Sequence, residues 1–214
     1  MKNLAFIPAK SFSNRIPRKN FLDINGKTLV DYTIDLATNC KNISEIYLST
    51  DKNYLPQKTI HNLKVHIRSK EQSNPELTVL ELINLWLVEN KILFDNLILL
   101  QPTHPFRTHL EVDKVISKFN KERSSYDSLV TYTSQKIRHI ASSSDEINVK
   151  RHLVKSERFI NGQVYIFKNI NNRISYGDKT LLYKTTPSVF DVNVDEPHEL
   201  ELAKILAKEF KKYI

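Results

Sequence analysis

Short apolar segments of strand length alternate with longer segments of helical periodicity along most of the chain. The segments of strand character are residues 3–8, 46–51, 63–67, 96–101, 128–132 and 163–167. Apolar residues follow helical spacing in residues 28–41, 76–91, 109–122 and 197–213. Strands that alternate with helices pack as a mainly parallel sheet with helices on both faces. The pattern therefore predicts an α/β fold of three layers, formed by residues 1–214 as a single domain.

Three of the strand-like segments lead into polar or proline-marked loops at their carboxyl ends. These ends are Pro8-Ala9-Lys10, Ser49-Thr50-Asp51 and Gln101-Pro102-Thr103. In open parallel sheets, ligands bind beyond the carboxyl ends of the strands. We therefore expect a ligand site where these three loops meet.

Glycine is unusually scarce, since Gly26, Gly162 and Gly177 are the only glycines among 214 residues. No two of them lie close in sequence, so a G-x-G-x-x-G dinucleotide loop and a Walker A loop are both impossible. A phosphate site in this chain must use other backbone amides and cationic side chains.

The remaining composition excludes several classes of protein. Cys40 is the only cysteine, which rules out an intrachain disulfide and a zinc site built from cysteines. No segment approaches the roughly 20 apolar residues of a membrane span, and the first apolar run is too short for a signal peptide. We expect a cytoplasmic protein that does not insert into membranes.

The formal net charge of +8 fits either nucleic acid or a small polyanionic substrate as the partner. No nucleic-acid-binding motif is present, and aromatic residues are not interleaved with the basic loop. We therefore expect a small polyanion rather than nucleic acid. The seven histidines form no ligand-spaced pair, so a zinc enzyme is not expected.

A basic loop follows the first strand and carries Lys10, Arg15, Arg18 and Lys19. Pro8 and other prolines restrict its backbone, which reduces the entropy lost when it binds a ligand. Such a loop can present amides and cations to a triphosphate without glycine. A loop of this charge is also compatible with a solvated surface segment, and the charges alone leave both interpretations open.

The segment from Ile7 to Asn20 resembles the N-terminal signature of the CMP-sialic acid synthetase (acylneuraminate cytidylyltransferase) family, I-P-A-R-x-x-S-K-x-I/L-P-x-K-N. Lys10 replaces the usual arginine, which retains the charge but loses the bidentate guanidinium. Asn14 replaces the usual lysine, and Phe12 stands where glycine is frequent.

Five further segments resemble the same family in the same order and extend the resemblance to about residue 203. They are Leu48-Ser49-Thr50-Asp51, Ile67-Arg68-Ser69 with Ser73-Asn74, Leu99 to Arg107 (LLQPTHPFR), Asn161 to Ile166 (NGQVYI), and Asn193 to Leu200 (NVDEPHEL). The departures include Asn74 for aspartate, His104 for serine, Gln163 for alanine and Asn193 for aspartate.

The resemblance implies a fold of the nucleotide-diphospho-sugar transferase type and transfer of CMP from CTP to a 2-keto-3-deoxy sugar acid. Lys10 and Lys19 would neutralise the phosphates as catalytic residues. The residues implied in nucleotide binding are Pro8, Ala9, Ser13, Asn20, Arg68, Ser73 and Asn74. Those implied in sugar binding are Gln101, Thr103, Arg107, Asn161, Gly162 and Tyr165.

Most of the sugar-site residues also have an ordinary structural interpretation. Gln101 can cap a loop, and Arg107 can brace that loop, face an anion or pair with a nearby carboxylate. Asn161-Gly162 can form a turn that enters strand 163–167, since Asn-Gly is a common turn pair. Tyr165 can be a core or interface aromatic.

The resemblance also implies a bound Mg²⁺ or Mn²⁺ ion. The metal carboxylates of the family map to Asn193 and Asp195, so one expected charge has become a neutral oxygen donor. Asp191 would lie on the same strand face as these residues if a strand extends that far. The alternative for Asp191 and Asp195 is a turn and helix cap before Pro197.

Residues 133–160 interrupt the alternation and are predicted to be a less regular insertion or arm. In relatives, such an arm helps to close the site of the second subunit of a homodimer, and Arg151 and Arg158 are candidates for that role here. Three alternatives to a synthetase for sialic-type acids remain: a CMP-Kdo synthetase, a nucleotide-binding homologue with weakened catalysis, and a basic nucleic-acid-binding module.

Overall fold

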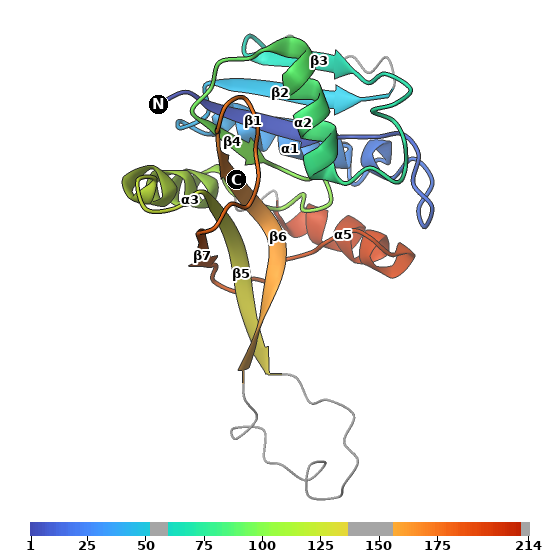
Figure 1. Ribbon diagram of the computed structural model, residues 1–214. Helices are drawn as coiled ribbons and strands as arrows, with labels where there is room; N and C mark the ends of the chain where they lie inside the picture. The colour runs from blue at the N-terminus through green and yellow to red at the C-terminus, as the bar shows by residue number, and fades with distance from the viewer. Residues whose placement is uncertain (52–59, 137–155, 211–214) are drawn as a thin grey trace, which may run out of the picture.

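A computed structural model describes residues 1–51, 60–136 and 156–210 (Figure 1). They form a seven-stranded sheet with the order β3-β2-β1-β4-β6-β5-β7. The strands are β1 (Asn3–Pro8), β2 (Glu45–Thr50), β3 (Leu63–Ile67), β4 (Asn96–Leu99), β5 (Ser128–Lys136), β6 (Ser156–Lys168) and β7 (Thr180–Lys184). The helices are α1 (Leu29–Asn39), α2 (Val79–Asn90), α3 (His109–Glu122) and α5 (Pro197–Phe210), with a 3-10 turn η1 (Lys19–Phe21).

The first half of the sheet is parallel. β1 lies between β2 and β4, and β3 pairs with the outer edge of β2. Side chains on both faces of β1 are fully buried, which explains why its sequence is continuously apolar rather than alternating. The predicted parallel core is confirmed.

The second half of the sheet has mixed direction. β6 runs antiparallel to both β4 and β5, whereas β7 runs parallel to β5. β7 was not predicted, because Thr180–Lys184 is short and only partly buried and therefore lacks a strong apolar signal. With four parallel and two antiparallel pairings, the sheet is mainly parallel, as predicted.

Helices cover both faces of the sheet (Figure 1). Ala5 and Ile7 of β1 point into a core formed with α1 and α3. Leu4 and Phe6 point the other way, into a core that contains Trp86 of α2. The three-layer prediction is confirmed, and it follows from the alternation of side chains along β1.

Threonine residues fix where three of the helices begin. Thr28 and Thr78 form capping boxes with Asp31 and Glu81, and Thr108 accepts a hydrogen bond from the backbone of the third helical residue of α3. These caps place the start of α2 three residues later than the predicted 76–91. In the part of the chain that the structure describes, none of the helices is long and apolar enough to cross a membrane.

The predicted irregular arm is partly regular. Residues 133–136 of β5 pair with residues 156–159 of β6 in an antiparallel ladder that extends beyond the body of the sheet (Figure 1). The prediction of irregular structure was wrong for these residues because the alternation of polar and apolar residues is poor in this ladder. Residues 137–155, including Arg151, and the predicted helix end at 211–213 lie outside the described residues.

Candidate active site

A cavity of about 170 Å³ lies at the carboxyl ends of the parallel strands, between the segments that follow β1, β3 and β4; the third predicted strand end, Ser49-Thr50-Asp51, contributes no residue to its wall. We call it the strand-end cavity. Its walls are formed by Pro8, Lys10, Lys19, Asn20, Arg68, Gln72, Asn74, Leu77, Val79, Leu82, Gln101, Pro102 and Thr103. Eight of these residues are among the predicted site residues, so the structure brings most of the predicted nucleotide site together.

The basic loop after β1 is held in place by hydrogen bonds to Asp51, at the end of β2, and by one hydrogen bond within the loop. The backbone N–H and the hydroxyl of Ser11 both donate to the carboxylate of Asp51, at 2.7 and 2.9 Å. Asn20 donates from its side chain to the carbonyl oxygen of Lys10 at 2.9 Å. The turn η1 then buries Lys19 and Asn20 although both are polar. The loop is therefore ordered before any ligand binds, which favours the phosphate-binding interpretation over a solvated surface segment.

Arg68 is anchored from β2 rather than by a carboxylate. Its Nε donates to Ser49 Oγ at 2.9 Å and its Nη2 donates to the Ser49 carbonyl at 3.1 Å. Burial lowers the pKa of the Arg68 guanidinium to about 10, and the charge of Asp51 opposes this shift. Arg68 is thus a charged, oriented donor in the wall of the cavity at neutral pH.

Three predicted nucleotide-binding residues do not line the cavity. Ala9 is fully buried beneath the loop, where its N–H donates to the Ser49 carbonyl. The Ser73 hydroxyl donates to the carbonyl of Ser69 and so closes a local turn. Ser13 is half-buried in the loop, outside the cavity wall.

Gln72 was missed by the sequence analysis. Its side chain is buried, donates to Glu89 at 2.8 Å, accepts from the backbone of Ser69 at 3.1 Å, and forms part of the cavity wall. No motif marks this residue. The apolar part of the wall (Leu77, Val79 and Leu82) lies at and just before the start of α2, within the predicted helix 76–91, but the sequence analysis did not place that helix at the site.

Asp195 is at the centre of a charged cluster beside the cavity. Lys19 Nζ lies 2.6 Å from Asp195 Oδ1, and Asn193 Nδ2 donates to Asp195 Oδ2 at 2.6 Å. Arg15 pairs with Glu196 at 2.7 Å and lies 3.9 Å from Asp195. Burial raises the pKa of Asp195, but the hydrogen bond and the charge of Lys19 outweigh it, so the net pKa lies below its usual value.

The donors at Asp195 and Asn193 fit a magnesium ion that is bound mainly through substrate phosphates. Asn193 Oδ1 is buried and has no hydrogen-bond partner, so it is an unsatisfied neutral oxygen two residues from a carboxylate. Mg²⁺ commonly uses one or two protein oxygens and keeps waters and phosphates as its other ligands. Among the described residues, no group of three or more His, Cys, Asp or Glu side chains could hold a metal by itself.

Asp191 is placed apart from these donors. Residues 191–195 are not in a strand, so the strand face proposed for Asp191 does not exist. Its carboxylate accepts from the Gln163 side chain and from the Ser188 backbone. The strand extension was wrong because the chain turns at residues 189–190 before it reaches α5.

Arg107 braces the loop that follows β4. The fully buried guanidinium donates to the carbonyl oxygens of Gln101 at 2.8 Å and Gln163 at 2.5 Å. Burial lowers its pKa to about 9. Of the alternatives left open, the structure supports bracing, because in the described residues its bonds go to carbonyls and a hydroxyl, not to a carboxylate.

The Asn161-Gly162 pair lies inside a bulge of β6, not in a turn before the strand. Four residues of β6, 161 to 164, face the single residue Thr131 of β5. Asn161 fixes this bulge, because its side chain accepts from Thr131 Oγ1 and donates to Thr185 Oγ1, both at 2.7 Å. Gly162 has a φ of +70°, which favours glycine. The turn interpretation is therefore wrong, since β6 begins at Ser156.

His104 connects the loop after β4 to this bulge and was not predicted as a site residue. A Cβ atom placed on Gly162 would lie 2.9 Å from His104 Cε1. His104 Nδ1 is 3.3 Å from Thr103 Oγ1. Burial lowers the pKa of His104 to about 3, with a further contribution from the charge of Arg107, so the ring is neutral.

Tyr165 follows the bulge and is half-buried. Its ring lies parallel to that of Phe167, with 6.5 Å between the centroids, and burial raises the pKa of its hydroxyl. Thr103 and Gln101 open toward the strand-end cavity, while Thr103 accepts from the Val194 backbone at 2.8 Å. That last bond attaches the segment carrying Asp195 to the loop carrying Gln101.

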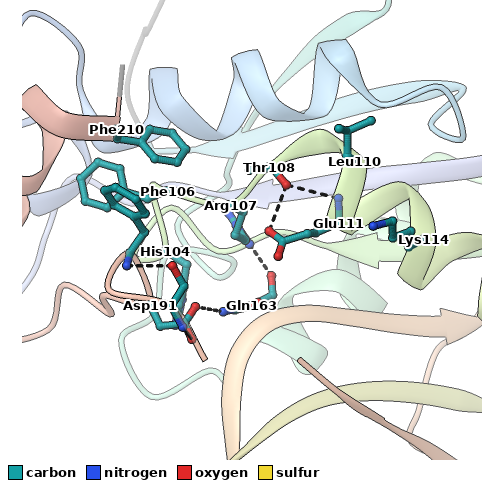
Figure 2. A pocket seen from close by; sticks show the side chains of 12 residues that line it. His104, Phe106, Arg107, Thr108, Leu110, Glu111, Lys114, Gln163, Asp191 and Phe210 are labelled. Atoms are coloured by element: carbon teal, nitrogen blue, oxygen red, sulfur yellow. Dashed lines mark hydrogen bonds between the residues drawn. The ribbon is translucent and has the colours of Figure 1, made fainter. Parts of the chain in front are cut away.

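A second cavity of about 390 Å³ lies beyond Arg107, between α3, α5 and the bulge of β6 (Figure 2). Figure 2 shows Asp191 meeting Gln163, and Arg107 reaching the Gln163 backbone, on one side of it. Phe106, Phe190 and Phe210 form an aromatic wall. This cavity contains Arg107 and Asp191 from the predicted set but none of the predicted nucleotide residues, so it is not the predicted site.

The fold and the strand-end cavity fit a nucleotidyl-transfer enzyme of the α/β class, with lysine and arginine side chains rather than a glycine-rich loop in the cavity wall. The chain belongs to the cytidylyltransferase family, whose profile matches residues 4–208. The predicted family, the enzyme class and the use of CTP are confirmed.

Relatives with similar sequences cover almost the whole chain. The pseudaminic acid cytidylyltransferase of Campylobacter jejuni subsp. jejuni serotype O:23/36 is 27% identical, over 97% of each chain. The CMP-N,N'-diacetyllegionaminic acid synthase of Legionella pneumophila subsp. pneumophila is 26% identical, over 96% of each chain.

Among solved structures, a CMP:2-keto-3-deoxy-manno-octonic acid synthetase complexed with CTP has a TM-score of 0.65, with 14% identity over 98% of this chain and 99% of the other. The similar 4-diphosphocytidyl-2C-methyl-D-erythritol synthase from Anaerococcus prevotii has a TM-score of 0.61, with 13% identity over 97% and 96%. These two structures confirm the predicted fold type.

Proposed function

We propose that the protein transfers CMP from CTP to a nonulosonic (sialic-type) 2-keto-3-deoxy sugar acid for surface glycan biosynthesis. The single observation that carries this proposal is the convergence of Lys10, Lys19 and Arg68 on one strand-end cavity beside Gln101 and Thr103. Three cations at one cavity suit a triphosphate, and polar side chains next to them suit a hydroxylated acceptor.

The reaction forms a bond between the anomeric oxygen of the sugar acid and the α-phosphorus of CTP. The bond from that phosphorus to the oxygen bridging to the β-phosphate breaks, pyrophosphate leaves, and the proton of the sugar hydroxyl passes to solvent. Lys10 and Lys19 would neutralise the phosphate charge that builds up during this step, and Arg68 would hold the nucleotide. The ordered basic loop supplies these groups with little reorganisation.

The sugar acid would bind next to the triphosphate, above the loop of Gln101 and Thr103. In the described residues, no group bonds the side-chain amide of Gln101, which leaves that amide available to sugar hydroxyls. Gly162 allows the close approach of the His104 ring to the backbone of the bulge, and Tyr165, which does not line the strand-end cavity in this structure, would lie beside the sugar acid. Arg107 and Asn161 would act by holding the two loops in place, as their bonds indicate.

We assign a Mg²⁺ or Mn²⁺ ion to the carboxylate of Asp195 and the side-chain oxygen Oδ1 of Asn193. When bound, the ion would neutralise phosphate charge and orient the triphosphate. Asp191, whose carboxylate is directed to Gln163 and Ser188, is a less suitable ligand than these two.

We also propose that the protein works in the cytoplasm as a homodimer, in which the ladder of β5 and β6 forms the arm. The extension of this ladder beyond the body of the sheet supports the proposal, as do Phe159 and Ile160, which are exposed on it. Arg158 lies over the Tyr132 ring at 5.5 Å and would be positioned by it for such a contact.

The test is pyrophosphate release from CTP and magnesium with a panel of purified sugar acids, namely sialic, legionaminic and pseudaminic acids and Kdo. We expect release with at least one nonulosonic acid and little with Kdo. Release with Kdo alone would identify a CMP-Kdo synthetase. No release with any acid, from protein that still binds CTP, would identify a homologue with weakened catalysis, an alternative that Asn193 and Lys10 motivate. Asp195→Ala should abolish turnover and leave the fold intact.

A further inference from the structure

The ammonium group of Lys19 lies where it can pair either with the carboxylate of Asp195 or with a phosphate bound in the strand-end cavity. Its side chain lines the strand-end cavity, while its ammonium lies 2.6 Å from the carboxylate oxygen Oδ1 of Asp195. Only 11% of the Lys19 side chain is exposed, so an anion must compensate for the lost hydration of the ammonium. In this structure, that anion is Asp195.

Both carboxylate oxygens of Asp195 already accept a hydrogen bond in this arrangement. Lys19 takes Oδ1, and the Asn193 amide takes Oδ2 at 2.6 Å. Arg15 adds further positive charge at 3.9 Å. Lys19 and Arg15 are thus already paired with the carboxylates of Asp195 and Glu196, while the nearby Glu199 accepts from the backbone N–H groups of both acidic residues.

A divalent cation added to this cluster would meet two positive groups at close range. Lys10 stands in the same cavity, and in the described residues its ammonium has no ion-pair partner, so the excess of positive charge would grow further. The repulsion between like charges in a partly buried site is substantial. A nucleotide triphosphate removes this excess, because its phosphates supply the missing anions next to Lys19.

We propose that Lys19 is a built-in counter-cation that keeps divalent metal away from Asp195 until a phosphate chain replaces Asp195 as the partner of Lys19. Phosphate binding then frees Oδ1 of Asp195, two residues from the unsatisfied side-chain oxygen Oδ1 of Asn193. The metal therefore binds with or after the nucleotide. The inference rests on the proposed function only for the identity of the phosphate ligand.

The role of Lys19 is tested by Mn²⁺ binding, measured from the electron paramagnetic resonance signal of free Mn²⁺. Without nucleotide, we expect wild-type protein to bind Mn²⁺ weakly and Lys19→Met to bind it at least about tenfold more tightly, a difference of about 1.4 kcal/mol. Lys64→Met is the control, because it removes a lysine that forms a salt bridge with Glu45 and does not line the strand-end cavity; it should leave this Mn²⁺ affinity at or near the wild-type value.

A second substitution locates the effect. The gain of Lys19→Met should disappear in the double variant Lys19→Met/Asp195→Asn. Equal Mn²⁺ affinity of wild type and Lys19→Met, or a gain that survives Asp195→Asn, would overturn the proposal. Thermal unfolding checks that each variant is folded, and Lys19→Gln replaces Lys19→Met if the methionine variant is not.

The nucleotide arm uses a CTP analogue with a methylene group between the α- and β-phosphorus atoms, which binds but does not react. With the analogue present, Asp195→Asn should weaken Mn²⁺ binding to the protein–nucleotide complex. Unchanged affinity would overturn the proposal that Asp195 binds the metal once phosphate has replaced it as the partner of Lys19. Calorimetry of CTP binding separates the two proposals. No CTP binding would contradict the proposed function, while the nucleotide-free comparison would still decide the role of Lys19.

Discussion

The imidazole ring of His104 lies against the backbone of Gly162, so closely that a Cβ atom on Gly162 would come within 2.9 Å of His104 Cε1. His104 belongs to the loop after β4, and Gly162 belongs to the bulge of β6. The contact therefore joins the two segments proposed to hold the sugar acid. Because the two residues are in contact, the stability cost of a substitution at one of them depends on the side chain at the other, and this coupling can be measured.

Gly162→Ala should destabilise the protein for two reasons that can be separated. The positive φ costs about 1 kcal/mol for alanine, and the contact with His104 adds a steric cost. Gly26→Ala is the matched control, because Gly26 has a φ of +85° and nothing within 4 Å of its Cβ position. Denaturant unfolding should show a larger loss for Gly162→Ala than for Gly26→Ala.

The steric part should disappear when His104 is made smaller. In a His104→Ser background, Gly162→Ala should cost no more than Gly26→Ala does in the wild type. A double-mutant cycle measures this coupling. Additive losses would show that the ring of His104 does not press on residue 162.

His104 should make the stability of the protein depend on pH. Its pKa is about 3 in the folded protein, far below its usual value of 6.5, with burial as the main cause. The unfolded chain therefore binds a proton that the folded chain does not, so stability is full above pH 6.5 and falls as the pH drops toward 3. Each pH unit below about 6 should cost about 1.4 kcal/mol from this group.

The measurement is chemical denaturation at pH 7, 6 and 5. His104→Gln should lose less stability between pH 7 and pH 5 than the wild type. His61→Gln removes an exposed histidine and should follow the wild-type pH dependence. Parallel curves for wild type and His104→Gln would contradict the assignment of a neutral, buried ring.

Arg107→Lys should destabilise the fold although it keeps the charge. The guanidinium joins the carbonyls of Gln101 and Gln163, and one ammonium cannot replace both bonds in a fully buried position. We expect a loss of about 2–4 kcal/mol in unfolding free energy. Arg107→Met should lose a similar amount. A well-folded Arg107→Lys with reduced affinity for the sugar acid would instead assign Arg107 to substrate binding.

Asn193→Asp should reduce the magnesium requirement of the reaction. The change restores a second carboxylate beside Asp195 and so strengthens the attraction for a divalent cation. The magnesium concentration for half-maximal pyrophosphate release should fall several-fold, by analogy with the charge dependence of other oxygen-ligand sites. Asn193→Ala, which removes the oxygen donor, should raise it. The same magnesium requirement in all three proteins would remove residue 193 from the metal site.

The parallel half of the fold was predictable because local and tertiary signals agree there. β1, α1 and α3 have strong apolar periodicity, and the predicted range of α3, 109–122, is identical to the observed helix. β7 and the first half of β6 were missed for the opposite reason. Their residues are half-exposed, so the pairing with β5 rather than an apolar pattern makes them strands.

The candidate site was predicted best where it depends on strand ends. Lys10, Arg68 and Gln101 meet in one cavity because the topology brings carboxyl ends together, a rule that needs no knowledge of side-chain contacts. The roles of His104 and Gln72 depend on contacts between segments far apart in the chain. Those contacts leave no periodic or compositional mark, so the sequence alone could not show them.

The salt bridge between Lys19 and Asp195 joins residues 176 positions apart. All seven strands are complete by Lys184, whereas Asp195 follows later in the chain. A nascent chain that has left the ribosome only as far as β7 would therefore contain the sheet and the basic loop but not the carboxylate proposed to bind the metal ion. The proposed metal ligands are thus made after the described sheet, so an unfinished chain would hold the basic loop without the ion that is proposed to orient the triphosphate.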